Sequence, residues 1–368
     1  MDKRVPFLDL RIADDAERRE LLQAVERVFR HGRIVLGPEV TELETMVAAH
    51  CGRKFGIGVS SGTDALFSAL RALDIGPGDE VITTSLSWIA TANAVAMTGA
   101  TPVFADIRDD LNIDPDSVRR LIGPRTKAIL PVHYTGKMCD MPALMNIALQ
   151  HKLRVIEDAS QAFDAEVHGR KAGNFGIVSC FSMNPMKVFA ACGEAGMVVT
   201  DREDLRDRLI RLRYNGTINR EECVEPSLNG RIDTLQAAIL LARLAGVAQI
   251  IERRRQIARW YDELLAGYVE TPRESPGYRD VYYTYTIRSS RRDALKAHLE
   301  ALGIETKIHH PILMPHQPAY RNAVRGEFRR AEQLVRQVLC IPMHEKLSGA
   351  DVHYVADGIR SFSRKAAA

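Results

Sequence analysis

The sequence lacks several features that would assign it to a specialised class of protein. Its six cysteines are dispersed over 368 residues without a Cys-x-x-Cys pair, which is typical of reduced thiols rather than of a disulfide framework or a zinc site. Basic and acidic side chains are interspersed and nearly balance at a net charge of +3, so neither nucleic-acid binding nor a membrane-binding face is predicted. No uncharged stretch approaches the roughly 18 residues of a membrane-spanning helix, and the N-terminus has no apolar signal region. We therefore expect a cytoplasmic protein that acts on small molecules.

The chain is long enough, and at 46% hydrophobic residues apolar enough, to build more than one core. The expected organisation is a large domain over residues 1–240, which begins with a helical segment, and a smaller C-terminal α/β domain over residues 241–368. Residues 231–266 read as one long helix that links the two. Further helices are expected at 292–302 and 327–338.

Short apolar strands alternate with amphipathic helices between residues 55 and 200. This alternation predicts an α/β fold with a mostly parallel central sheet covered by helices on both faces. The expected strands are 56–59, 80–83, 102–106, 128–132, 155–158, 178–181 and 196–200. Ligands of such sheets bind beyond the carboxyl ends of the strands, so the residues that follow each strand are the candidates for a site.

Two of these strand ends carry residues suited to a phosphorylated, planar ligand. The first strand leads through Ser61, Gly62 and Thr63 into a helix, whose free N–H groups and positive dipole end favour a phosphate. The alternative is that these residues only cap the helix, because an ordinary helix N-cap has the same residue types. Trp88 follows the second strand and could stack on a planar ring, although an aromatic residue there is more often part of the core.

Two further strand ends carry an acid and an amine. Asp158 ends a buried strand, where a carboxylate needs a partner such as a cationic ring nitrogen, and Gln161 could bond a ring hydroxyl. The plain alternative is that Asp158 caps the following turn. Ser182 ends the strand 178–181, and Lys187 follows it in a setting where a lysine can lose its proton and act as a nucleophile.

Taken together, these loops supply a phosphate seat, a stacking ring, an acid for a ring nitrogen and an amine for an aldehyde. Pyridoxal 5'-phosphate requires all four. The sequence therefore predicts this cofactor, bound as an imine to Lys187.

Longer motifs resemble the DegT/DnrJ/StrS sugar aminotransferases, a family of fold-type I enzymes that depend on pyridoxal phosphate. The matching segments cover nearly the whole chain in the family's order. They are Gly37-Pro38, Ser61 to Leu66, Gly76 to Ile82, Gly99 to Phe104, Ile156 to Ala162, Asn229 to Ala238, and Ala331 to Met343.

The resemblance implies a role for each candidate residue. Lys187 would be the Schiff-base lysine, Asp158 would pair with the pyridine nitrogen, Gln161 would contact the ring hydroxyl, and Trp88 would stack on the ring. The phosphate would be held by Gly62, Thr63 and Ser182, joined by Asn229 from the other subunit of a homodimer. The implied reaction moves an amino group from an amino acid, expected to be L-glutamate, to a keto-sugar, which the resemblance implies is nucleotide-linked.

Some features leave the substrate and the class of activity open. The chain departs from the family's pattern at Asp164 and Ala195, where the family usually has glycine, and at Tyr214 and Asn215, where it usually has a histidine. These departures bear on the substrate rather than on imine chemistry. Two alternatives remain: a sugar dehydratase dependent on the same cofactor, and a catalytically silent relative with a regulatory role. The histidines at 309, 310 and 316 lack acids or cysteines at ligand spacing, so we expect pocket or loop residues and no metal.

Overall fold

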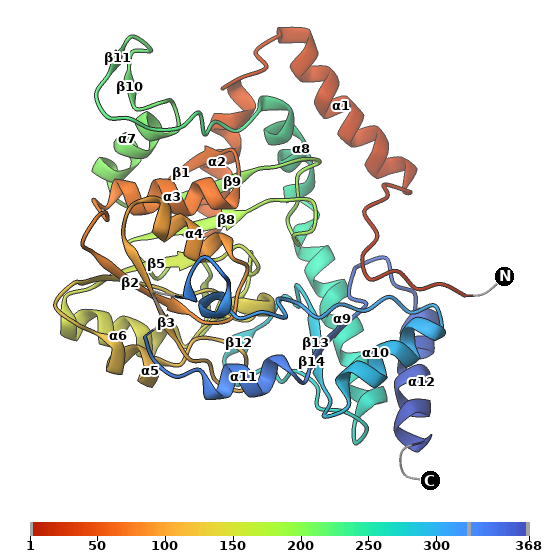
Figure 1. Cartoon of the computed structure of the whole chain (residues 1–368). Coiled ribbons are helices and arrows are strands. Elements are labelled where there is room, and N and C mark those ends of the chain that lie inside the picture. Colours follow the sequence, from red (N-terminus) through yellow and green to blue (C-terminus); the bar gives the residue numbers. More distant parts are fainter. Residues whose placement is uncertain (1–2, 322–324, 366–368) are drawn as a thin grey trace.

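The computed structural model describes residues 3–321 and 325–365, and its centre is a seven-stranded sheet with strand order β1-β9-β8-β5-β4-β2-β3 (Figure 1). All seven predicted strands are present. Their bounds are β1 Phe55–Val59, β2 Glu80–Thr84, β3 Thr101–Ala105, β4 Thr126–Leu130, β5 Arg154–Asp158, β8 Val178–Ser182 and β9 Gly196–Thr200. Only β9 runs antiparallel to its neighbours, so the prediction of a mostly parallel sheet is confirmed.

Helices cover both faces of this sheet, as the apolar strands require. Neighbouring strand residues point to opposite sides, so that Val155 joins one hydrophobic core and Ile156 the other. The first core packs under α2 (Pro38–His50), α5 (Pro115–Leu121) and α6 (Met141–His151). The second packs under α3 (Gly62–Ala72), α4 (Ala90–Met97) and α7 (Glu203–Leu212).

The helix boundaries follow from local chemistry. In α1 (Asp15–His31), the Asp14 carboxylate accepts hydrogen bonds from the first turn, and Gly32 ends the helix at φ 70°. In α5, Asp114 caps the first turn and Pro115 occupies the first helical position, where its missing N–H is not needed.

The predicted single helix over residues 231–266 is wrong, because the chain breaks there. It forms α8 (Thr234–Leu244) and α9 (Val247–Leu265), bent by 63° at Ala245 and Gly246. Glycine is a poor helix former, and the break lets α8 follow the large core while α9 crosses to the C-terminal part. The predicted boundary at residues 240 and 241 falls inside α8.

The C-terminal part is a small α/β unit to one side of the sheet (Figure 1). Its strands β13 (Tyr285–Arg288) and β14 (Val338–Ile341) pair antiparallel, so the helix predicted to reach residue 338 ends earlier, as α11 (Arg329–Val335). Around them lie α9, α10 (Arg292–Ala301) and α12 (Gly349–Lys365). Val5 packs into this core and bridges Ile304, so the start of the chain returns to its end.

Short elements complete the fold. A hairpin of β10 (Thr217–Ile218) and β11 (Glu222–Cys223) projects away from the sheet (Figure 1). A small sheet joins β12 (Tyr278–Arg279), β6 (Glu166–Val167) and β7 (Arg170–Lys171), and two 3-10 turns span Tyr134–Gly136 and Met314–His316. Among the described residues, no single helix is both long and apolar enough to cross a membrane.

Candidate active site

The predicted phosphate seat lies where the start of α3 meets the end of β8. Ser61 caps α3 by accepting a hydrogen bond from the N–H of Asp64 at 3.2 Å. A Cβ on Gly62 would lie 2.5 Å from the Cβ of Ser182, so only glycine allows this approach. The structure therefore brings Gly62 and Ser182 into contact, with Thr63 in the same first turn of α3.

Asp158 lies at the carboxyl end of β5, in register with Cys180 of β8 and 3% exposed. Its Oδ2 accepts a hydrogen bond from the Thr91 hydroxyl at 2.8 Å, and its Oδ1 accepts one from the Ser160 N–H at 3.2 Å. The second bond is the turn cap that the plain alternative predicts, and the first is an additional donor from α4. Each oxygen of the Asp158 carboxylate therefore accepts a hydrogen bond from a described residue.

Trp88 precedes α4 and is 61% exposed, so it is not a core residue of the single chain. Its ring lies 5.8 Å from that of His310, centroid to centroid, in a tilted arrangement. The Thr91 N–H bonds the carbonyl of Trp88 at 3.2 Å, which ties the tryptophan to the helix turn that supports Asp158. An exposed indole beside the sheet edge is available to stack on a ligand.

Lys187 lies over the ring of Tyr283, with 4.5 Å between Nζ and the ring centroid. Its amine forms neither a hydrogen bond nor an ion pair with the described residues. The rings of His309 and His310 pack 4.2 Å apart, and Tyr134 shares a hydrogen bond of 3.0 Å with Nδ1 of His310. Burial, assisted by the positive charge of Lys187, lowers the pKa of His309 to about 4 and that of His310 to about 2. Both imidazoles are therefore neutral at physiological pH.

Gln161 is 5% exposed and accepts a hydrogen bond from the Thr135 N–H at 3.0 Å. Thr135 adopts a left-handed backbone with φ 61°, an uncommon conformation for a threonine. Its neighbour Tyr134 reaches the histidine pair. One 3-10 turn thus connects Gln161 with the surroundings of Lys187.

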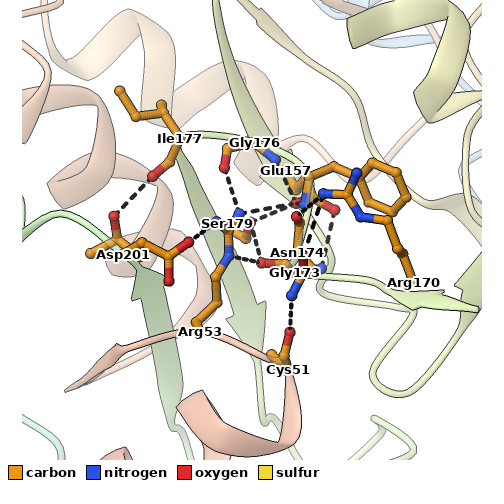
Figure 2. A network of polar contacts seen from close by, with 12 residues as sticks. Cys51, Arg53, Glu157, Arg170, Gly173, Asn174, Gly176, Ile177, Ser179 and Asp201 are labelled. Carbon is orange, nitrogen blue, oxygen red and sulfur yellow. Dashed lines mark hydrogen bonds and ion pairs between the residues drawn. The ribbon is translucent and has the colours of Figure 1, made fainter.

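A buried network of polar contacts surrounds Glu157, which precedes Asp158 in β5 (Figure 2). Glu157 accepts hydrogen bonds from the backbone of residues 173, 175 and 176, from Ser179 at 2.7 Å, and pairs with His133 at 3.0 Å. Burial raises the pKa of Glu157, but the bonds to His133 and these donors outweigh it and lower the pKa to about 2. Arg53 closes the network through the carbonyls of Gly173 and Gly176. The network holds β5, and hence Asp158, in a fixed position.

Asn229 forms no hydrogen bond with the other predicted site residues of its own chain. It is exposed, accepts a hydrogen bond of 2.7 Å from Arg231, and bonds none of Gly62, Thr63 and Ser182 within its own chain. The adjacent Gly230 packs against Asp64, so the segment is anchored beside α3.

Two of the departures from the family pattern have a visible structural basis. Asp164 has φ 68°, which explains why glycine suits the position, and its carboxylate meets His50 at 2.7 Å, Lys171 at 2.5 Å and Arg279 at 3.2 Å. Burial raises the pKa of Asp164, but the interactions with His50 and Lys171 outweigh it and lower the pKa to about 2. Asn215 likewise has φ 56°, whereas nothing in the structure explains Ala195.

Sequence reasoning missed three contributors to this region, namely Thr91, Tyr134 and Tyr283. Thr91 lies three positions after Trp88 at the start of a helix, a spacing that could have suggested a shared face. Tyr283 precedes β13 in the C-terminal part, and no motif in the sequence connects it with Lys187.

A cavity of about 640 Å³ opens beside the loop that carries Lys187. Its walls include the loop 185–192, residues of the N-terminal segment 8–14, and the ion pair of buried Arg254 with half-buried Glu345, 3.2 Å apart. Trp88, Asp158 and Ser182 do not line it, so it extends the surroundings of the lysine without containing the whole candidate site.

These donors fit pyridoxal 5'-phosphate. A helix start with a serine suits a phosphate, a fixed buried carboxylate suits a protonated ring nitrogen, an exposed indole suits a planar ring, and a lysine amine without polar partners suits a carbonyl. Among the described residues, no group of three or more histidine, cysteine, aspartate or glutamate side chains could hold a metal ion.

The sheet order, the smaller C-terminal unit and the residues at the strand ends define an α/β enzyme of the fold-type I aminotransferase class. The chain belongs to the DegT/DnrJ/EryC1/StrS aminotransferase family, whose model matches residues 15–360. It is 41% identical, over 98% of its length and 97% of the relative's, to a dTDP-3-amino-3,4,6-trideoxy-alpha-D-glucose transaminase of Streptomyces venezuelae. It is 40% identical to a UDP-N-acetyl-3-dehydro-alpha-D-glucosamine 3-aminotransferase of Acidithiobacillus ferrooxidans, with 97% of each chain covered.

Solved structures agree with this assignment. The crystal structure of S. venezuelae DesV in complex with a ketimine intermediate superimposes with a TM-score of 0.95 at 41% identity, covering 98% of both chains. The predicted fold class and the prediction of an aminotransferase are confirmed.

Proposed function

We propose that the chain uses pyridoxal 5'-phosphate to move an amino group from L-glutamate to a nucleotide-linked keto-sugar. The observation that supports this proposal is that Asp158 and the Gly62–Ser182 contact lie at the carboxyl ends of the neighbouring strands β5 and β8, with Lys187 five residues beyond β8. The phosphate would be held by Gly62, Thr63 and Ser182, the ring by Trp88 and Gln161, and the ring nitrogen by Asp158.

The bound cofactor would supply an electron sink that stabilises a carbanion at the carbon losing its proton. The protein's own groups would manage the protons. Lys187 Nζ has no polar partner among the described residues, so it would be free to move protons. It would take a proton from the α-carbon of the amino donor and would later give one to the acceptor carbon that receives the amino group. Asp158 would keep a proton on the ring nitrogen, and Thr91 with the Ser160 N–H would hold its carboxylate in place. The neutral histidines at 309 and 310 would add no positive charge beside Lys187.

The acceptor class rests on the relatives, which are named for dTDP- and UDP-linked sugars. Because the two named relatives differ in nucleotide, the proposal stops at a nucleotide-linked keto-sugar. The free, dispersed cysteines support a cytoplasmic location.

The test uses the purified protein loaded with pyridoxal 5'-phosphate. Its visible absorption should disappear on addition of L-glutamate and return when a suitable keto-sugar is added. Lys187→Ala should fail to complete this cycle. Bound cofactor without any response to amino donors would favour the silent regulatory relative, and release of water without net amino transfer would favour the dehydratase.

We further propose that two copies of the chain share each site. On α1, Leu22 and Phe29 are 62% and 59% exposed and lie seven residues apart on one face, while Leu21, Ala24 and Val28 pack inward. A second copy of the chain packed against this face of α1 would bury Leu22 and Phe29. It would also explain why Asn229 bonds no phosphate-seat residue of its own chain.

Mixing two inactive variants tests this arrangement. If Asn229 serves the partner's site, Lys187→Ala mixed with Asn229→Ala regains up to about a quarter of wild-type activity, because half of the dimers are mixed and each holds one intact site. If Asn229 serves its own site, the mixture regains none. Sedimentation of the unmixed protein as a monomer would contradict the shared site independently.

A further inference from the structure

A second cavity, of about 650 Å³, lies between the large sheet domain and the C-terminal part. The loops after β3 and after β4 form one wall, through residues 109–111, Thr135 and Lys137, and the segment 262–288 forms the other. None of the residues proposed to hold the cofactor lines it. It is therefore a separate space that the proposed reaction does not use.

The wall of this cavity contains a buried carboxylate without a full set of partners. Asp280 is 4% exposed, and its Oδ1 has no hydrogen-bond partner among the described residues. Its Oδ2 lies 3.8 Å from Lys137 Nζ, beyond hydrogen-bond distance. Lys137 instead donates to the Arg273 carbonyl at 2.7 Å and to Ser275 at 3.1 Å.

The electrostatics agree with this geometry. Burial raises the pKa of Asp280 to about 7, because the attraction of Lys137 only partly offsets the loss of solvent and the nearby carboxylate of Glu274 opposes ionisation. An unpaired buried carboxylate is costly, and a cationic partner for Asp280 would offset that cost.

The rest of the lining narrows the chemistry of an occupant. Hydroxyl groups are contributed by Thr135, Thr271, Ser275, Thr284 and Thr286. The carboxylate of Glu270 is already paired with Arg288 at 2.5 Å, and Asp262 accepts the Tyr285 hydroxyl at 2.6 Å. No described group of three acidic, histidine or cysteine side chains could bind a metal here. The two other lining acids also have partners, since Asp109 pairs with Arg330 and Asp110 accepts a hydrogen bond from the Asn112 N–H. Hydroxyl groups around one acid that lacks a full set of partners suit a hydroxylated amine better than a bare ion or an anion.

We propose that this cavity binds a small polyhydroxylated primary amine whose ammonium group pairs with Asp280. The proposal does not rest on the proposed reaction, since it follows from the cavity and its unpaired acid. The cavity borders the turn that holds Gln161, because Thr135 donates its N–H to Gln161 and its carbonyl accepts the Thr284 N–H at 3.3 Å. An occupant would therefore contact both domains and this turn.

The experiment compares two probes that differ only in the ammonium group, 1-amino-1-deoxy-D-sorbitol and D-sorbitol. Each is titrated calorimetrically at pH 8 into the cofactor-loaded wild type, Asp280→Asn and Ala266→Arg. Asp280→Asn preserves the shape of the side chain, and Ala266→Arg places a competing cation at the exposed rim without touching the core.

The amine should bind the wild type in the millimolar range or better and at least about tenfold more weakly to both variants, while sorbitol binds at least about tenfold more weakly than the amine. Equal affinity of the amine for wild type and Asp280→Asn, equal affinity of the two probes, or no binding to the wild type in the millimolar range would each overturn the proposal. The visible absorption, followed in parallel, reports any reaction of the amine with the cofactor, and binding that occurs only with such a change would also overturn it. Failure here leaves the response to L-glutamate unaffected, so the two proposals fail separately.

Discussion

Replacing Thr91 by valine removes one hydroxyl donor and keeps the shape of the side chain. The Thr91–Asp158 hydrogen bond is 2.8 Å long and joins two side chains that are 2% and 3% exposed, so water cannot readily replace it. Loss of a buried hydrogen bond to a charged group costs about 1.5–3 kcal/mol, and we expect the free energy of unfolding of the cofactor-free protein to fall by that amount. The freed carboxylate must also be ordered again when a ring nitrogen binds, at about 0.5–1.5 kcal/mol, which corresponds to roughly 2- to 10-fold weaker cofactor binding.

Two measurements separate these effects. Urea unfolding of the cofactor-free protein gives the change in stability, and titration with pyridoxal 5'-phosphate, followed by visible absorption, gives the change in affinity. Thr91→Ser keeps the donor and should remain within about 1 kcal/mol of wild type. Wild-type stability and affinity in Thr91→Val, or equal losses in the serine and valine variants, would refute the positioning role of the hydroxyl.

Three further predictions concern the surroundings of the site. Gly62→Ala should weaken cofactor binding by at least about tenfold with an intact fold, because the added Cβ would meet Ser182. Gly76→Ala is the control and should bind the cofactor normally, because its Cβ would lie 3.6 Å from the nearest neighbouring atom. Equal binding by both variants would contradict the close approach. In wild type, the lowered pKa of Glu157 contributes roughly 3 kcal/mol to the unfolding free energy above pH 4.5, and this is lost as the carboxylate is protonated between pH 4.5 and about 2. Glu157→Gln should therefore show a smaller fall in unfolding free energy over that range. An unchanged slope in acid unfolding curves would contradict this. Asparagine tolerates the left-handed backbone at position 164, so Asp164→Asn removes the charge without straining the chain. It should lower the unfolding free energy by about 1–2 kcal/mol at pH 7. The difference should shrink as pH falls from 3.8 towards 2, where wild-type Asp164 also loses its charge, and a pH-independent difference would point to packing instead.

The strands were predictable because helices cover both faces of the sheet, so each strand is a short apolar run between turn residues. The direction of β9 was not, since Gly196–Thr200 has the same apolar pattern in either direction. Its antiparallel course depends on the loop from Ser182 to Gly196. This loop starts β9 at the same end of the sheet where β8 ends, instead of crossing over the face of the sheet to the other end. The break at Gly246 was missed because the apolar spacing continues across it.

The candidate site was predictable to the extent that it lies at strand ends. Asp158 and Ser182 end strands, and Gln161 and Lys187 follow within five residues, so their neighbourhood can be inferred from the order of the sheet. Tyr283 comes from the C-terminal part, and its place beside Lys187 depends on how that part folds back, which no local pattern encodes. The partner proposed for Asn229 lies on another chain and is outside what one sequence can fix.

The helix α9 has a consequence for how the chain can be divided. Its first turns, with Val247 and Ile251, belong to the core of the large domain, and its later turns, with Ile257 and Tyr261, belong to the C-terminal core. Val5 crosses in the opposite direction, from the N-terminal end of the chain into that same C-terminal core. A fragment ending at residue 240 would therefore expose apolar surface in both halves. Heat should unfold the two parts in one cooperative transition, and limited proteolysis should find no early cut between them.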